Sequence, residues 1–96
     1  MPLYLDIHRD VEGLTPEAIE EVHRRDLALQ HKYDITLLKY WYDVNSKTAF
    51  CLMIGPNKEA CVALHREAHG LLPDEIFEVS EGKEPEGMSE ISDNLV

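Results

Sequence analysis

Two histidines four residues apart, His65 and His69, have the spacing of metal ligands on a helix. Side chains at this spacing share one face of a helix, with Cβ atoms about 5–6 Å apart, so both rings can reach one metal ion. The alternative is a pair of partly buried histidines that hydrogen-bond and pack, which is the commoner outcome for an isolated pair. Because the residue directly after His65 is Arg66 and not a glutamate, the pair is not the His-Glu-x-x-His motif of a zinc protease.

A second polar set, His23, Asp26 and Gln30, recurs at helical spacing further upstream. These side chains border an apolar stripe. Either they form a hydrogen-bonded network that secures the packing of two helices, or they belong to a ligand shell. In the second case Asp26 orients a metal-bound imidazole as an outer carboxylate, and His23 lies close to the two histidines downstream.

Asp6 and His8 stand two residues apart in a segment that alternates strictly between apolar and polar side chains. In a strand the two therefore share one face, and Leu3, Leu5 and Ile7 share the other. If the leucines and the isoleucine lie under helices, Asp6 and His8 lie on the open face of the sheet, where two copies of the chain meet. A carboxylate with an imidazole suits nickel, zinc or cobalt. The alternative is a polar rim around an interface.

Changes in hydrophobic period predict the elements that must position these residues. Alternation over 3–8 predicts a strand, and Thr15 as N-cap with Pro16 at the first helical position begins a helix that ends near residue 33 or 34. Strands follow over 35–43 and 48–54, joined by a turn at 45–46. A second helix covers 58–69 and is closed by Gly70, and a last strand covers 75–79.

This order predicts an α+β, ferredoxin-like βαββαβ fold, in which two helices cover one face of a four-stranded antiparallel sheet. The other face stays uncovered. Whichever residues of 36–43 and 48–54 point outwards, large apolar side chains are among them. Because an exposed apolar patch usually marks an interface, we expect a homodimer that pairs the open sheet faces.

The 96 residues carry a net charge of −10, and the acidity is concentrated towards the C-terminus. We expect a ferredoxin-like domain over 1–79 and an acidic, flexible tail over 80–96, because the tail has too few apolar residues to offset its ordering entropy. The alternative is an arm that docks on a partner subunit through Ile91, Leu95 and Val96. The acidic balance argues against nucleic acid and anionic membrane surfaces as partners.

The two cysteines, Cys51 and Cys61, lack the Cys-x-x-Cys spacing of a metal site and are interpreted as core residues of a cytoplasmic protein. No run approaches the about 18–20 apolar residues of a membrane span. The sequence has no recognisable nucleophile turn and no glycine-rich phosphate loop. We therefore expect a binding protein rather than an enzyme.

Three segments together resemble a bacterial family of small proteins of unassigned function whose characterised member binds nickel. They are 4–8 running into 13–16, 23–30 continuing through 38–41, and the most specific one, His65-Arg-Glu-Ala-His-Gly-Leu71 with 74–76. The resemblance covers almost all of 2–79 and none of the tail. It implies a modified ferredoxin-like fold, a homodimer and nickel near the dimer interface. The sequence departs from its relatives in three places: the third strand ends Met53-Ile54-Gly55, where relatives often place an acidic residue, Asp34 stands where a glycine often closes the first helix, and the acidic tail is extra.

The sequence thus predicts a homodimer that binds nickel or another divalent transition metal, for sequestration or response to metal load. The expected ligands are His65 and His69 with His23 close by, and Asp6 with His8 as a second site at the dimer face. Binding requires neutral imidazoles and weakens as the pH falls through about 6.5. Rings that point apart, or that are each saturated by protein hydrogen bonds, would remove the metal hypothesis.

Two alternatives remain open at this point. One is a dimeric α/β barrel that binds a small molecule or acts on it as an enzyme, with Asp6, His8, Lys39 and Trp41 lining an internal cavity. It rests on fold-level analogy alone. The other is a plain interaction domain that docks through its sheet or its tail.

Overall fold

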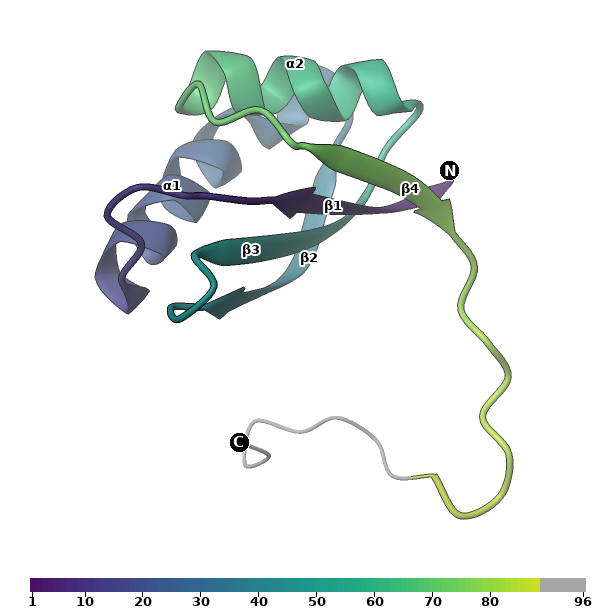
Figure 1. Ribbon diagram of the computed structural model, residues 1–96. Helices are drawn as coiled ribbons and strands as arrows, with labels where there is room; N and C mark the ends of the chain where they lie inside the picture. The colour runs from purple at the N-terminus through teal and green to yellow at the C-terminus, as the bar shows by residue number, and fades with distance from the viewer. Residues whose placement is uncertain (89–96) are drawn as a thin grey trace.

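A computed structural model of the chain describes residues 1–88. The elements follow in the order β1 (Leu3–His8), α1 (Pro16–Leu29), a 3₁₀ helix η1 (Gln30–Tyr33), β2 (Thr36–Asp43), β3 (Thr48–Ile54), α2 (Lys58–Ala68) and β4 (Glu75–Val79) (Figure 1). This is the predicted βαββαβ order, and the ferredoxin-like fold is confirmed. Within the described residues, no helix is long and apolar enough to cross a membrane.

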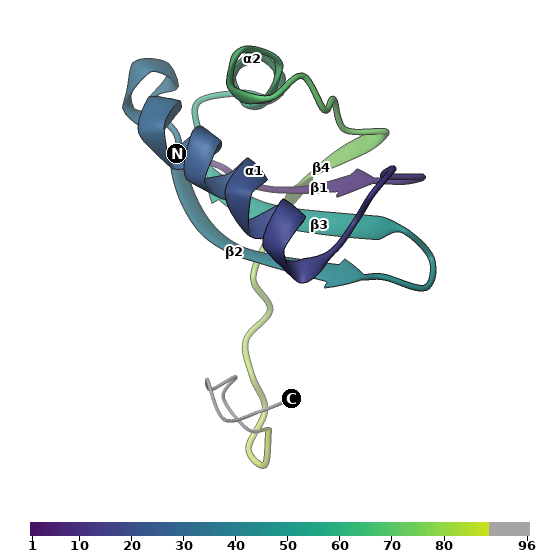
Figure 2. The same cartoon turned by 90° about the vertical axis from the view of Figure 1, so that its left-hand side faces the viewer.

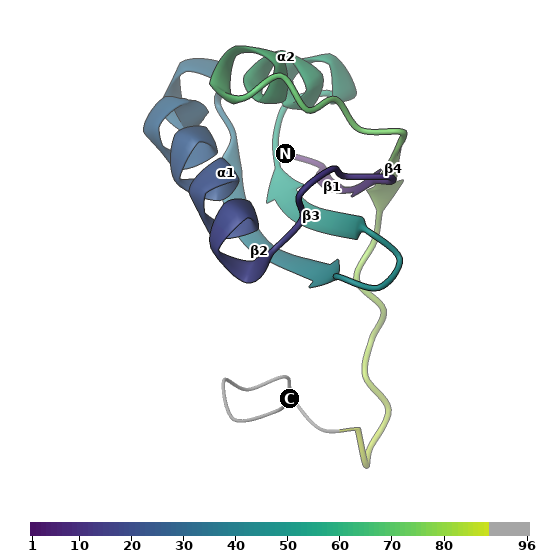
Figure 3. The same cartoon turned by 60° about the vertical axis from the view of Figure 1, so that its left-hand side comes forward.

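The four strands form one antiparallel sheet in the order β2-β3-β1-β4, so β1 and β3 lie in its centre. Both helices lie on the same side of this sheet (Figures 2 and 3). The chain continues past β4 away from the two helices, without regular strand or helix over 80–88. The division at residue 79 stays a prediction, and Ile91, Leu95 and Val96 lie outside the described residues.

The helix ends follow their capping residues. The Thr15 side chain accepts a hydrogen bond from the amide of Ala18 at 3.1 Å, which begins α1 where the sequence predicted. The α-helix ends earlier than expected, because the chain tightens into η1 after Leu29. Asp34 then closes η1 in the left-handed conformation, with φ at 56°. An aspartate tolerates this conformation, so it can replace the glycine that often stands there.

The face of β1 that packs under the helices is the polar one. Asp6 is fully buried and His8 is only 9% exposed, with Tyr4 beside them, whereas Leu3, Leu5 and Ile7 are half-buried on the other face. The expectation that Asp6 and His8 lie on the open sheet surface is therefore wrong. The reason is that α1 and α2 bring their own buried polar side chains to this layer, and these need polar partners from the sheet.

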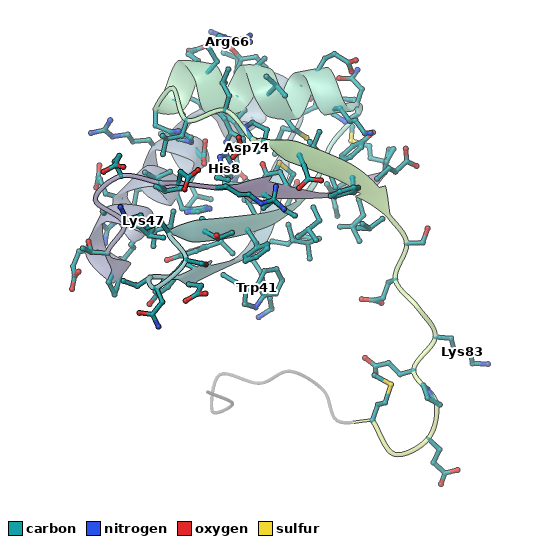
Figure 4. The ribbon with its side chains drawn as sticks, in the orientation of Figure 1. His8, Trp41, Lys47, Arg66, Asp74 and Lys83 are labelled. Carbon is teal, nitrogen blue, oxygen red and sulfur yellow. The ribbon has the colours of Figure 1, made fainter. Side chains whose placement is uncertain are left out.

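A bulge in β2 also changes which of its side chains face the helices. Leu37 pairs with Met53, but the next paired residue is Lys39, opposite Leu52, so Leu38 is an extra residue. The alternation reverses at that point, and Leu37 and Tyr40 both face the helices. Lys39 and Trp41 face the other way, and Figure 4 shows Trp41 and His8 on opposite sides of the sheet.

The uncovered face of the sheet carries large apolar side chains from every strand. We call six of these residues the open face: Leu5, Ile7, Trp41, Phe50, Leu52 and Phe77. Trp41 and Phe77 are 41% and 45% exposed, and the other four are half-buried. Neither helix covers them (Figure 2). An apolar open face, expected from the sequence, is thus present.

The layer between the sheet and the helices holds two apolar clusters. One surrounds Met53 and Leu64, and the other surrounds Val11 and Ile19. Along α1 they are separated by His23 and Asp26, which are both buried. The core is therefore interrupted by polar residues at the position where both helices and the two central strands meet.

Candidate metal centre

His65 of α2 lies between two carboxylates at the centre of the polar layer. Its Nε2 atom is 2.7 Å from Oδ2 of Asp6, and its Nδ1 atom is 3.0 Å from Oδ1 of Asp26. The ring is 1% exposed, and both carboxylate residues are fully buried. Because carboxylates accept hydrogen bonds, the geometry fits an imidazolium that donates one N–H to each of them.

His69, the C-cap of α2, is joined to the same cluster through Asp26. Its Nε2 atom lies 3.0 Å from Oδ1 and 3.2 Å from Oδ2 of that carboxylate. Its Nδ1 atom accepts a hydrogen bond from the amide of Leu71 at 3.1 Å, so Nε2 carries the proton that is donated to Asp26. Asp26 therefore contacts both histidines of the predicted pair.

His8 approaches from the other end of the cluster. Its Nε2 atom lies 3.3 Å from Oδ1 of Asp6, without the geometry of a hydrogen bond, and its ring meets that of His65 edge-on at 5.3 Å. Within residues 1–88, the buried atoms Oδ1 of Asp6 and Nδ1 of His8 have no hydrogen-bond partner. Buried polar atoms are rarely left in this state, so this end of the cluster has unused capacity to bind a ligand.

His23 borders the cluster without a hydrogen bond to it. Its Nδ1 atom bonds the carbonyl oxygen of Ile19 at 2.8 Å, and its ring stacks on Tyr40 at 3.9 Å with an angle of 12° between the planes. Because Nδ1 faces a carbonyl, it is the protonated nitrogen, and Nε2 keeps the lone pair. Burial lowers the pKa of His23, which favours this neutral form.

The protonation states of the central three groups depend on each other. Burial alone would lower the pKa of His65, but its hydrogen bonds with Asp26 and Asp6 raise it to about 9. Burial alone would raise the pKa of Asp26, but its bonds with His65 and His69 lower it to about 2. Burial alone would also raise the pKa of Asp6, but its interactions with His65 and His8 together lower it. Two carboxylates thus surround one imidazolium, which leaves a buried negative charge that attracts cations.

A cavity of about 10 Å³ lies beside the cluster. Five polar residues line it, and all of them were candidates from the sequence: His8, His23, Asp26, His65 and His69. Space of this size holds about one water-sized particle. The cavity therefore suits a single ion and is too small for an organic substrate.

Two sets of three side chains have the arrangement of metal ligands, and His65 belongs to both. In the first set, one ligand atom each of Asp26, His65 and His69 lie within 4.8 Å of one another. In the second set, the same holds for Asp6, Cys51 and His65. The carboxylates of the two sets, Asp26 and Asp6, lie at opposite nitrogens of the His65 ring.

The structure thus brings the predicted site residues together, in a different grouping from the expected one. His65 and His69 meet at Asp26, with His23 on the same cavity. Asp6 and His8 join this cluster from β1, so the expected second site at the dimer face is not a separate site. Gln30 stays outside, because its side chain accepts the amide hydrogen of Leu37.

The sequence assigned Cys51 to the core, and this is confirmed, because Cys51 is buried in the apolar cluster around Met53 and Leu64. The sequence did not show that Cys51 also pairs with Asp6 across β1 and β3, so that both side chains project under the helices and Cys51 joins a set of possible ligands. The pairing register of two strands 45 positions apart in the chain would have been needed to see this. The structure argues against the alternative of a barrel cavity lined by Asp6, His8, Lys39 and Trp41. Asp6 and His8 lie on the helix side of the sheet, whereas Lys39 and Trp41 lie on the other side.

The chain is thus a small ferredoxin-like α+β protein with a carboxylate–imidazole cluster enclosed between its sheet and its two helices. The family model described as nickel responsive protein SCO4226-like matches residues 4–79, and the chain belongs to this family. The chain is 33% identical to SCO4226 from Streptomyces coelicolor A3(2), whose crystal structure superposes with a TM-score of 0.79. The match covers 84% of this chain and 99% of that one. The comparison with curated proteins gave no match.

Proposed function

We propose that this protein binds nickel, or a similar divalent transition metal, at His65 in the buried cluster, and that it acts as a homodimer in metal sequestration or response. One observation carries the proposal: His65 completes a set of three ligand groups on either side of its ring, beside a cavity that fits one ion. The name of the family is consistent with nickel as the ion.

The hydrogen bonds of His65 are a direct challenge to this proposal, because both ring nitrogens already have partners. The partners are carboxylates, however, and a carboxylate and an imidazole can bind one metal ion together in place of the proton that they share. Two ligand atoms about 2.1 Å from one ion, at right angles, lie about 3.0 Å apart. His65 and His69 are each 3.0 Å from Oδ1 of Asp26, so little movement is needed when an ion replaces the protons.

The chemistry of the donors also fits the ion. Imidazole nitrogen with carboxylate oxygen suits nickel, zinc and cobalt, whereas a site for magnesium or calcium would consist of oxygen atoms. The neutral ring of His65 can bind an ion through one nitrogen while the other donates its hydrogen to the opposite carboxylate. That carboxylate then fixes the orientation of the ring.

The homodimer is supported by the open face. Its six apolar residues come from all four strands, and neither helix covers them. Leaving such a face in water is unfavourable, and a second copy of the same face covers it with matched apolar surface.

A titration of the untagged protein with Ni²⁺ tests metal binding at His65. We expect one tight site per chain in the wild type and in His31→Ala, whose histidine is exposed on η1, and loss of that site in His65→Gln. Equal affinity in His65→Gln, once circular dichroism shows that it is folded, would contradict the proposal. If His65→Gln does not fold, metal analysis of the untagged wild type decides, because a chain without the site retains no stoichiometric metal.

A further inference from the structure

We propose that Cys51 is a metal ligand, and that the bound ion lies on the Asp6 side of His65, held by the Asp6 carboxylate, the Cys51 sulfur and Nε2 of His65. This inference rests on the proposed function and adds to it the side of the ring, the thiolate and a preference for thiophilic ions.

The first support is geometric. One ligand atom each of Asp6, Cys51 and His65 lie within 4.8 Å of one another, and all three residues are at most 1% exposed. Asp6 and Cys51 are direct partners on neighbouring antiparallel strands, so the sheet itself holds their side chains next to each other. Strands hold ligand side chains in place more precisely than loops do.

The second support is the difference between the two sides of the His65 ring. On the Asp26 side, both carboxylate oxygens and both ring nitrogens of His69 have hydrogen-bond partners. On the Asp6 side, Oδ1 of Asp6 and Nδ1 of His8 are buried without a partner in the described part of the chain. An ion bound next to Asp6 replaces the hydrogen bond between Nε2 of His65 and Oδ2 of Asp6, and it gives the unpartnered Oδ1 a partner. An ion bound by His65 and His69 at Asp26 replaces the hydrogen bonds of both rings and gives no unpartnered atom a partner.

The two possible positions of the ion, beside Asp6 and beside Asp26, also differ in what the carboxylate on the other side of the His65 ring can do. With the ion on Nε2, the Nδ1 hydrogen of His65 stays bonded to Asp26, which in turn holds His69. This is the carboxylate–histidine–metal arrangement, in which an outer carboxylate fixes the tautomer and the ring orientation of a ligand. Asp26 is then a positioning residue, which is one of the roles the sequence suggested.

Binding at this position balances in bonds and charge. The S–H bond of Cys51 and the Nε2–H bond of His65 break, the ion gives up bound water, bonds form from the ion to sulfur, to nitrogen and to the Asp6 carboxylate, and two protons leave to water. No electron is transferred. Burial raises the pKa of the Cys51 thiol above its ordinary range, so sulfur keeps its proton until an ion replaces it. A thiolate among the ligands favours zinc, cobalt, nickel or copper over magnesium and calcium.

Cys61 is a natural control for Cys51. Both are free, buried thiols in the apolar cluster around Met53 and Leu64, but Cys61 lies on α2 and Cys51 lies on β3 opposite Asp6. Neither set of three ligand groups in the described residues includes it. Any general effect of losing a buried thiol should therefore appear in both Cys51→Ser and Cys61→Ser. An effect on metal binding should appear in Cys51→Ser alone.

The experiment is a titration of the untagged full-length chain with Co²⁺, followed by absorption in the near ultraviolet. We expect a sulfur-to-metal charge-transfer band that saturates at one ion per chain in the wild type and in Cys61→Ser. In Cys51→Ser the band is absent and the affinity falls by at least about tenfold, the lower limit for loss of even an outer partner of a ligand.

A wild type that binds Co²⁺ without the band would overturn this inference and leave the proposed function intact. A band that persists in Cys51→Ser would also overturn it, since another sulfur would be the ligand. A wild type that binds no Co²⁺ or Ni²⁺ would remove both proposals. If Cys51→Ser does not fold, X-ray absorption of the metal-loaded wild type gives the answer, because sulfur and nitrogen or oxygen ligands differ in bond length by about 0.2 Å.

Discussion

Nδ1 of His65 lies 3.0 Å from Oδ1 of Asp26, and this contact joins the two helices across 39 positions of the chain. Both partners are essentially inaccessible to water. The contact therefore has two consequences: it holds α1 and α2 in register over the sheet, and it orients the imidazole for the atoms on its other side. The first consequence concerns stability and the second concerns metal binding.

Asp26→Asn tests the first consequence. The change keeps the shape of the side chain but leaves an imidazolium with one anionic partner instead of two. We expect a loss of about 3–5 kcal/mol in the free energy of unfolding, the range for breaking a buried ion pair. Urea denaturation of metal-free protein near pH 6 measures it. Asp10→Asn, at an exposed aspartate, should change stability by less than about 0.5 kcal/mol. Equal effects of the two changes would show that the buried contact does not stabilise the fold.

The stability of the metal-free protein should fall as the pH rises from 6.5 to 9. The folded-state pKa of His65 is about 9, above its unfolded value of 6.5, so its contribution is complete below pH 6.5 and lost as the pH passes 9. The folded-state pKa of Asp26 is about 2, so its contribution is present above pH 3.8 and lost as the pH falls through 2. The lowered pKa of His23 acts in the opposite direction below pH 6.5 and leaves the alkaline limb unaffected.

Denaturation curves at a series of pH values, with a chelator present, measure this alkaline limb. His65→Gln supplies the control, because the decline between pH 6.5 and 9 should disappear in that variant. Wild-type stability that is constant or rising over this window would contradict the assignment of an imidazolium between two carboxylates.

Metal affinity should have the opposite pH dependence to metal-free stability. An ion must displace the proton of His65, whose pKa of about 9 means that protons compete well above the value of 6.5 expected from the sequence alone. We expect the apparent affinity for Ni²⁺ to rise by at least about tenfold per pH unit between 6.5 and 8.5, since one proton or more is released per ion. Competition titrations with a chromophoric chelator give the slope. An affinity that levels off above pH 7 would show that His65 is not a ligand.

A charge placed on the open face should separate the two subunits. Leu52 pairs with Leu5 at the centre of this face, and Leu52→Glu puts a carboxylate into the proposed interface. We expect a dimer in the wild type and a monomer in the variant by analytical ultracentrifugation. Leu27→Glu makes the same change at a leucine that is 51% exposed on α1, and it should remain a dimer. A dimer that survives Leu52→Glu would place the interface elsewhere.

The fold could be predicted from the sequence because its signals are local. Thr15 and Pro16 begin one helix, Asn57 caps the other, and Gly70 adopts a positive φ of 81° where α2 ends. The topology can be recognised without knowing the pairing register of the strands. Element order alone therefore predicts the ferredoxin-like arrangement.

The site could be predicted only in part, because its geometry depends on contacts between distant residues. Alternation in β1 shows that Asp6 and His8 share a face, but it does not show which face the helices cover. The leucines of β1 look like core residues, and only the carboxylate and imidazole groups on α1 and α2 explain why the polar face is buried instead. The bulge at Leu38 and the pairing of Asp6 with Cys51 likewise depend on strand register.

The most direct measurement of the central claim is the position of the ion itself, by anomalous diffraction at the nickel edge from a crystal of the nickel-loaded, untagged protein. We predict one strong peak per chain within bonding distance of the His65 ring, between the sheet and the helices and beside Asp6. Peaks confined to surface carboxylates, with the His65 ring still between two carboxylates at hydrogen-bond distance, would contradict the account.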